Sequence, residues 1–289
     1  MTPRDLHLSL VVPVYNGADR LPAALVQLRD HLCAQPYAWE LILVDDHSQQ
    51  PTVSLLREFS LRTPGVTVLR NDVNRGKGFS VSRGMLAARG RFRVFTDADL
   101  AYPTSEITKI LADLEAGADV AVACRVLPES RYLMSPSFFS YLYTRHLMSR
   151  MFNRMVRSTL IPGILDTQAG LKGFTASAAE LIFPRITIPR FGFDVEALFI
   201  ARKHGLEVRQ TPVHFRYDDE PTTVRFTADA FEMARDLGRI RVNDWRGRYE
   251  GIDGRQSPVA SNGSGEADLV RSTESLTTRS SRLATTASD

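Results

Sequence analysis

In the first half of the chain, short apolar runs alternate with longer stretches whose apolar residues have helical spacing. The apolar runs have the length and composition of buried strands. They cover residues 8–14, 40–44, 66–69, 92–95 and 120–124. The stretches with helical spacing cover residues 18–34, 52–61, 79–88 and 103–117. Strands that alternate with helices of about a dozen residues indicate βαβ units, so we expect an α/β fold with a mostly parallel central sheet flanked by helices.

The pattern is less regular after residue 125. Residues 166–174 have the composition of turns, and residues 207–215 resemble a strand. Helical spacing returns in three stretches, at residues 176–183, 191–203 and 228–242. Residues 251–289 contain no aromatic residue and are rich in Ser, Thr, Gly and Ala, which is typical of disorder. We therefore predict one domain at residues 1–250 and a disordered tail at residues 251–289.

Composition narrows the class of protein. The hydrophobic content of 43% and the charged content of 24% are typical of a soluble globular domain. The formal net charge of +3 is too small to indicate nucleic-acid binding. Cys33 and Cys124 form no disulfide framework, which favours a reduced, cytoplasmic compartment. Because no run of 18 apolar residues exists, we expect no membrane-spanning segment.

Residues 130–165 differ in character from the rest, because they contain no Asp or Glu. Their arginines are Arg131, Arg145, Arg150, Arg154 and Arg157, and aromatic and other apolar residues lie among them. A basic amphipathic helix of this kind favours the surface of an anionic membrane, so we predict a segment that faces the membrane and the acceptor. The alternative is a surface helix with its apolar side on the core and its arginines in solvent.

Two carboxylates, Asp97 and Asp99, follow the apolar run at residues 92–95. Ligands of open α/β sheets bind beyond the carboxyl ends of the strands. Two carboxylates at that position are suited to a hard divalent cation, which in turn can bind a diphosphate. The alternative is that both are loop and helix-cap residues, since Asp is common there.

Other strand ends supply further polar groups. Tyr15 is suited to lie against a nucleotide base. Asp45 or Asp46 could accept a hydrogen bond from that base or from the ribose. The alternative is that Asp45 and Asp46 form a turn and a helix cap. Gly76, Lys77 and Gly78 can bring backbone and a cation close to a phosphate. The chain has neither a Walker loop nor a GxGxxG after its first strand, which counts against kinases, ATPases and dehydrogenases.

Together these motifs resemble the family 2 inverting glycosyltransferases of the GT-A (nucleotide-diphospho-sugar transferase) fold. The motifs lie in order at residues 11–16 (Val-Val-Pro-Val-Tyr-Asn), 44–48 (Val-Asp-Asp-His-Ser), 74–78 (Asn-Arg-Gly-Lys-Gly) and 96–100 (Thr-Asp-Ala-Asp-Leu). Residues 166–174 and 190–196 are similar to the polyprenyl-phosphate branch, which includes dolichyl-phosphate glucosyltransferases and dolichyl-phosphate mannose synthases. The resemblance covers about residues 7 to 245.

The resemblance implies roles for individual residues on the donor side. The residues that it places at the nucleotide are Pro13, Tyr15, Asn16 and Asp45, with Asp46 supporting the pocket and Lys77 near it. Asp97 and Asp99 would hold Mg²⁺ or Mn²⁺ against the donor diphosphate, and Asp97 would also belong to the nucleotide site.

The resemblance also implies which residues take part in catalysis and which bind the acceptor. Asp99, Arg125 and Asp166 are the expected catalytic residues, with Arg125 stabilising charge on the diphosphate. Asp166 would orient the acceptor or act as a base; the alternative is a turn residue. Arg131 and Arg225 are candidates for a phosphate of the acceptor, although Arg131 fits a solvated arginine equally well. Asp194 and Glu196 begin a helix, so we expect a structural role for both.

The function implied is metal-dependent, inverting transfer of a hexose from a nucleotide sugar to a polyprenyl phosphate. Ala101 stands where mannose synthases often have Gln, which favours UDP-glucose over GDP-mannose as donor. We expect a peripheral protein on the cytoplasmic, inner face of a membrane, which docks by itself or pairs with a membrane-protein partner and binds no nucleic acid. Two alternatives stay open, namely transfer to a polysaccharide or lipid hydroxyl and a non-catalytic protein that binds nucleotide sugars.

Overall fold

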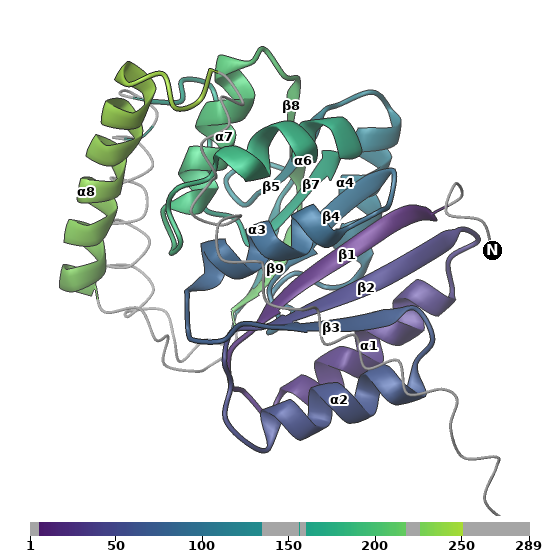
Figure 1. Ribbon diagram of the computed structural model, residues 1–289. Coiled ribbons are helices and arrows are strands. Elements are labelled where there is room, and N and C mark those ends of the chain that lie inside the picture. Colours follow the sequence, from purple (N-terminus) through teal and green to yellow (C-terminus); the bar gives the residue numbers. More distant parts are fainter. Residues whose placement is uncertain (1–5, 135–155, 157–159, 218–225, 251–289) are drawn as a thin grey trace, which may run out of the picture.

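A central sheet covered by helices on both faces forms the body of the protein (Figure 1). The computed structural model describes residues 6–134, 156, 160–217 and 226–250. Among them the main sheet has seven strands in the order β3-β2-β1-β4-β7-β5-β8. They are β1 (Leu6–Val14), β2 (Ala38–Asp45), β3 (Val66–Arg70), β4 (Phe92–Thr96), β5 (Val120–Cys124), β7 (Leu171–Thr175) and β8 (Val208–Pro212). A separate parallel pair consists of β6 (Arg131–Met134) and β9 (His214–Tyr217).

The helices are α1 (Leu21–Cys33), α2 (Thr52–Arg62), α3 (Lys77–Ala87), α4 (Ser105–Glu115), α6 (Ala176–Ile182), α7 (Phe193–Lys203) and α8 (Phe226–Trp245), with a short 3₁₀ turn at Phe183–Arg185. They pack against the core in two ways: α1 buries one apolar side, whereas every residue from Phe193 to Ala201 in α7 is buried. In α1 the buried residues are Leu21, Ala24, Leu25, Leu28 and Leu32, which recur every three or four positions as in an amphipathic helix. Figure 1 shows α1 and α2 on one side of the sheet and α3 on the other.

The predicted α/β architecture is confirmed, and most predicted elements lie within a few residues of the observed ones. One prediction was wrong: residues 171–174 are not a turn but most of β7, which pairs antiparallel with both β4 and β5. Gly173 and the buried Lys172 gave this stretch the composition of a turn. The predicted strand at residues 207–215 is in fact two strands, β8 and β9, and β6 was not expected.

The antiparallel direction of β7 determines what meets at the functional edge of the sheet. Parallel strands β1, β2 and β4 bring their carboxyl ends to one edge. Thr96 at the end of β4 pairs with Leu171 at the start of β7. The residues that precede Leu171 therefore arrive beside those that follow Thr96, so the predicted Asp166 segment and the predicted metal ligands become neighbours.

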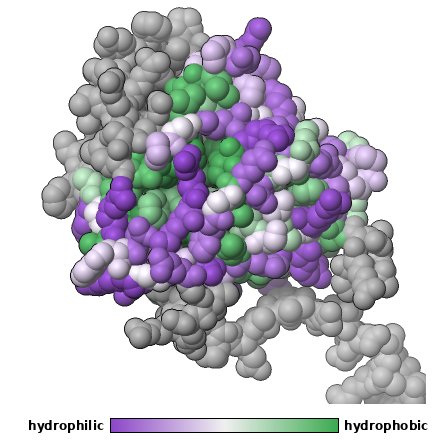
Figure 2. Space-filling view, turned by 90° about the horizontal axis from the view of Figure 1, so that it is seen from above, coloured by the Kyte–Doolittle hydropathy of each residue, from purple (hydrophilic) through white to green (hydrophobic). Residues whose placement is uncertain are grey.

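Several predictions fall outside the described residues. These are the role of Arg225, the disordered tail at 251–289 and most of the basic segment at 130–165. In the part of the chain that is described, no helix is both long and apolar enough to cross a membrane. Seen from above, the surface is largely hydrophilic, with hydrophobic residues showing mainly toward the centre of the view (Figure 2).

Two Gly→Ala substitutions should have opposite effects on stability. A Cβ at Gly173 would lie 2.5 Å from Ile110 Cγ2 and 2.8 Å from Leu114 Cδ1, both on α4. We expect Gly173→Ala to lower the free energy of unfolding by about 1–3 kcal/mol through overpacking. At Gly238, in α8, a Cβ would have no atom within 4 Å. Gly238→Ala should therefore raise the free energy of unfolding by about 0.5–1 kcal/mol, because it restricts the unfolded chain and favours helix.

Urea denaturation of the wild type and both variants measures the two changes. Equal effects of the two substitutions would contradict the close packing of β7 against α4.

Candidate functional site

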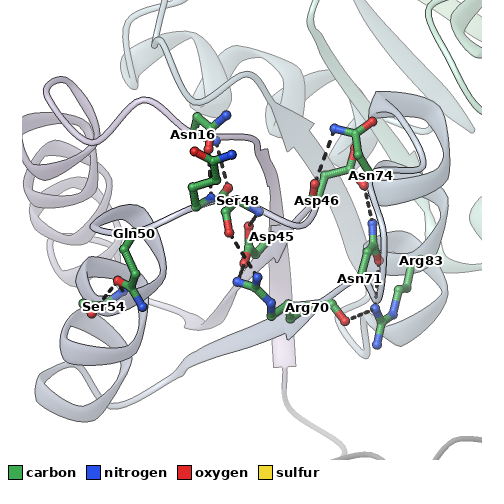
Figure 3. A network of polar contacts seen from close by, with 11 residues as sticks. Asn16, Asp45, Asp46, Ser48, Gln50, Ser54, Arg70, Asn71, Asn74 and Arg83 are labelled. Atoms are coloured by element: carbon green, nitrogen blue, oxygen red, sulfur yellow. Dashed lines mark hydrogen bonds and ion pairs between the residues drawn. The ribbon is translucent and has the colours of Figure 1, made fainter.

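The loops after β1 and β2 are tied to each other at the carboxyl edge of the sheet (Figure 3). Asn16 has a left-handed backbone, with φ of 56°. Its N–H donates to Ser48 Oγ at 2.8 Å, and its side-chain oxygen accepts from the N–H of Gln49 at 3.0 Å. Tyr15, next to it, is 58% exposed. The predicted nucleotide residues Pro13, Tyr15 and Asn16 thus lie together, with the ring of Tyr15 open to solvent.

Asp45 ends β2 and has its carboxylate buried inside the same loop. One oxygen accepts from the N–H of Ser48 at 2.8 Å, and the other accepts from the guanidinium of Arg70, at the end of β3. Arg70 also donates to the carbonyl oxygen of Ser48 at 3.0 Å. The carboxylate of Asp45 therefore holds the loop in shape, and this is the contact that the structure assigns to it.

Asp46 organises the next loop, which leads into α3. One of its oxygens accepts from Asn71 Nδ2 at 2.7 Å and from the N–H of Arg75 at 2.8 Å, and the other accepts from the N–H of Gly76 at 2.8 Å. Gly76 has φ of 94°, and a Cβ there would lie 2.7 Å from the carbonyl oxygen of Pro189. Asp46 thus holds the loop that leads to Lys77, and its support of a nucleotide pocket stays a prediction.

Lys77, the first residue of α3, contacts one of the two predicted metal ligands. Its Nζ lies 2.6 Å from Asp97 Oδ1. Burial alone would lower the pKa of Lys77, but the carboxylates of Asp97, Asp194 and Asp99 outweigh burial and raise this pKa. Lys77 is therefore a charged group at neutral pH, and its place near a nucleotide stays a prediction.

The two predicted metal ligands differ in their surroundings. The side chain of Asp97 is 30% exposed and lies against Gly170, where a Cβ would come within 2.0 Å of Asp97 Oδ2. Only glycine allows this approach. Asp99 is exposed, and one of its oxygens accepts from the N–H of Ala101 at 3.0 Å.

A buried ion pair that the sequence analysis missed lies close to Lys77. Lys172 Nζ is 2.5 Å from Asp194 Oδ1 and donates to the carbonyl oxygen of Ala169 at 2.6 Å. Burial lowers the pKa of Lys172 and raises that of Asp194, so burial opposes both charges. The available signal was a lysine within the sequence Leu-Lys-Gly-Phe, whose apolar residues fit a buried strand. Asp194 was expected to be structural, but it lies within reach of the site's charges.

Glu196, by contrast, makes contacts that fit the structural role expected for it. It accepts from the backbone N–H groups of Thr187 and Ile188, at 2.9 and 2.8 Å, and from the hydroxyl of Tyr249 at 2.7 Å. It thereby ties α7 to the segment before it and to the end of the described chain.

Arg125 and Asp166, both expected to be catalytic residues, form a buried ion pair that the sequence analysis did not predict. Arg125 Nε and Nη2 donate to the two oxygens of Asp166 at 2.7 and 2.9 Å, and the backbone N–H of Arg125 adds a third contact at 3.1 Å. Asp166 is only 1% exposed. Burial would raise the pKa of Asp166, but Arg125 outweighs burial and holds this pKa below its usual value.

Tyr102 lies close enough to Arg125, Asp166 and Asp97 for their charges to act on it. Its hydroxyl is buried. Burial raises its pKa well above the usual value, so the hydroxyl is a neutral donor. Its ring packs edge-on against Phe215, whose ring also lies 5.3 Å from the guanidinium of Arg125. The predicted Arg131 lies farther along the chain, exposed at the start of β6.

The donor groups at Asp97 and Asp99 fit a divalent cation of the hard, oxygen-binding type. Mg²⁺ is usually bound by one or two carboxylates together with phosphates of the substrate. Within the described ranges, no group of three or more His, Cys, Asp or Glu side chains could hold a metal by itself. The carboxylates of Asp97 and Asp99 therefore fit such an ion when a diphosphate completes its ligands.

Sequence comparison gives a family and several named relatives. A model of glycosyl transferase family 2 matches residues 9–181. The dolichyl-phosphate beta-glucosyltransferase of Drosophila melanogaster is 33% identical over 259 residues, covering 84% of this chain and 78% of that protein. The proteins of the same name from Dictyostelium discoideum and Homo sapiens are 30% and 31% identical, covering 82% and 84% of this chain and 74% and 77% of their own lengths.

Solved structures share the fold at lower identity. Glucosyl-3-phosphoglycerate synthase from Mycobacterium tuberculosis, in complex with Mn²⁺, UDP-glucose and phosphoglyceric acid, has a TM-score of 0.61. It is 16% identical, and the match covers 81% of this chain and 79% of that one. Mannosyl-3-phosphoglycerate synthase from Rubrobacter xylanophilus has a TM-score of 0.59 at 17% identity, with 86% and 77% covered. These matches confirm the predicted GT-A fold.

The contact between Arg125 and Asp166 predicts how stability depends on pH. Because the pKa of Asp166 is lower in the folded protein than in the unfolded chain, its contribution is present above the usual value of 3.8 and is lost as the pH falls further. We expect Asp166→Asn to lower the free energy of unfolding at pH 7 by about 3 kcal/mol, because it breaks a buried ion pair.

Urea denaturation at pH 7, and at the lowest pH at which both proteins fold, measures this difference. The difference in free energy of unfolding between the wild type and Asp166→Asn should become smaller as the pH falls. A difference that stays constant, or grows on acidification, would mean that Asp166 carries no charge in the folded protein.

Proposed function

Because the chain belongs to glycosyl transferase family 2 and is a glycosyltransferase, we propose that it transfers glucose, with inversion, from UDP-glucose to dolichyl phosphate or another polyprenyl phosphate. Support for the sugar and the lipid comes from the relatives, which are named dolichyl-phosphate beta-glucosyltransferases at 30–33% identity. Support for the donor comes from the related fold that binds UDP-glucose together with Mn²⁺.

We base the choice of a phosphate acceptor on the hydrogen bonds and the low pKa of Asp166. A hydroxyl acceptor needs a general base to remove its proton, whereas a phosphate is already ionised near neutral pH. Asp166 is the predicted base, yet both of its oxygens accept from Arg125 and its pKa is held low. A carboxylate in this state is a weak base. Asp194 differs from Asp166 in that burial raises its pKa, but Lys172 donates to its carboxylate and little of its surface is exposed.

The donor side of the proposal uses the residues that follow β1, β2 and β4. Tyr15 is the exposed ring for the uracil base, with Asn16 and the loop of Asp45 beside it. Asp97 and Asp99 would hold Mg²⁺ or Mn²⁺, and such an ion supplies positive charge against the diphosphate as the bond to glucose breaks. Lys77 provides a second cation at the same place.

Arg125 serves the reaction by its position. Asp166 accepts two hydrogen bonds from the guanidinium of Arg125. The orientation of the guanidinium is therefore set before any substrate binds. A preorganised cation of this kind stabilises developing charge without having to reorganise. We assign to Asp166 the positioning of Arg125. Arg131 and Arg225 stay candidates for the phosphate of the acceptor.

A polyprenyl phosphate lies in a membrane, so the protein must work at one. We propose a peripheral location on the cytoplasmic face, where nucleotide sugars are available, with or without a membrane-protein partner. The described helices are compatible with this location, since none of them could span a bilayer.

Assays with a panel of UDP- and GDP-sugars test the reaction. Each sugar is incubated with Mn²⁺ or Mg²⁺, with and without a polyprenyl phosphate in detergent, and the glycolipid is quantified. We expect metal-dependent transfer from UDP-glucose to the lipid phosphate, which Asp99→Ala abolishes. In Asp166→Asn the transfer should fall less than the roughly 10²–10⁴-fold expected for loss of a general base.

Transfer only to a hydroxyl acceptor, with Asp166→Asn inactive, would move the assignment to the hydroxyl alternative. Binding of a nucleotide sugar without any transfer would leave the non-catalytic alternative.

A further inference from the structure

The carboxyl end of α8 presents an uncovered face with an aromatic residue at its centre. Trp245 is 86% exposed and Val242 is 44% exposed. With Gly238 and Arg241 they recur at the spacing of one helical face. A methyl group added at Gly238 would have no atom of the described residues within 4 Å. We call residues 238–248 the α8 terminal surface.

The α8 terminal surface is also positively charged. Its exposed arginines are Arg239, Arg241, Arg246 and Arg248. Among the described residues, these four arginines and Lys203 outnumber the three acids beside them: Asp236 is buried, and Asp244 and Glu250 both accept from Lys203, at 2.6 and 2.9 Å. An exposed tryptophan alone would be ordinary for a protein surface. A tryptophan among arginines that outnumber the described acids is a surface suited to anionic headgroups.

This surface is fixed firmly to the domain. The side chain of Asn243 donates to Thr187 Oγ1 at 2.9 Å, and the hydroxyl of Tyr249 donates to Glu196 at 2.7 Å. The ring of His204 contacts the carbonyl oxygen of Tyr249 at 2.7 Å. These hydrogen bonds attach the α8 terminal surface to α7, whose first turn carries Asp194, and to the segment before it.

We propose that the α8 terminal surface docks on a bilayer that contains anionic phospholipids, with Trp245 at the level of the headgroups. Tryptophan is enriched at membrane–water interfaces because its ring is apolar and its N–H is polar. Arginines beside it gain from the negative surface potential of such a bilayer. The inference rests on the proposed function only in that a lipid acceptor requires the enzyme to meet a membrane.

Tryptophan fluorescence tests the docking without any substrate. The chain has two tryptophans, and the other, Trp39, is half-buried, with its ring 3.1 Å from a Cβ placed at Gly65. The full chain is titrated with vesicles of phosphatidylcholine, with and without phosphatidylglycerol. We expect a blue shift only with the anionic vesicles. The shift should be absent in Trp245→Phe, which reports Trp39 alone.

Vesicle co-sedimentation measures how much of the binding comes from this surface. In the double variant Arg241→Gln and Arg248→Gln, affinity for anionic vesicles should fall roughly fivefold for each arginine removed. Trp245→Ala should also weaken binding, and added salt should reduce the wild-type affinity. The matched control is Leu61→Ala on α2, where the exposed residue adjoins Arg62, already paired with Glu58 at 2.6 Å. This control should bind like the wild type.

Activity on a short, water-soluble prenyl phosphate separates this inference from the proposed function. The α8 variants should keep wild-type activity on that acceptor, since they lie outside the charged site. Vesicle binding without any sugar transfer would refute the function and leave the docking intact. Unchanged vesicle affinity in Trp245→Ala and in the double arginine variant would overturn the docking, as would binding that captures another protein but no anionic vesicle.

Discussion

The site depends on pairing three carboxylates, two of them buried, with cations where β4 and the antiparallel β7 meet. Lys77 contacts Asp97, Lys172 contacts Asp194, and Arg125 contacts Asp166. Removing such charges from water is costly, and the cost is offset only when each charge has a partner in good geometry. A network of this kind adds little net stability. What it provides is a fixed arrangement of charge at the edge of the sheet where a diphosphate and a phosphate would have to meet.

The backbone is shaped to make this network possible. Gly170 allows the side chain of Asp97 to lie directly against the loop before β7, and Gly173 allows β7 to pack against α4. Asp46 holds the loop that positions Lys77. Each feature acts on the next, because a shift of β7 would move Lys172 and Gly170 together and would therefore disturb both Asp194 and Asp97.

The sequence analysis was accurate where a local pattern determines the structure and incomplete where tertiary contacts do. The buried runs before Asp45 and Asp97 predicted the strand ends, and therefore most of the polar groups on the donor side. β7 was missed because glycine and lysine are both uncommon in the interior of strands, so the local sequence did not indicate one. They are tolerated only because α4 leaves no room for a side chain at Gly173 and because Asp194 pairs with Lys172. No local signal reveals that Asp166 faces Arg125, which lies 41 residues before it.

The most direct test of the central claim is the dependence of the transfer rate on pH with lipid acceptors whose phosphates have different pKa values. If the acceptor attacks as an already ionised phosphate, the midpoint of the pH–rate profile should move with the pKa of the acceptor. This midpoint should also be unchanged in Asp166→Asn. A midpoint that stays fixed while the acceptor changes, and that disappears in Asp166→Asn, would show that Asp166 acts as a base and would contradict the account.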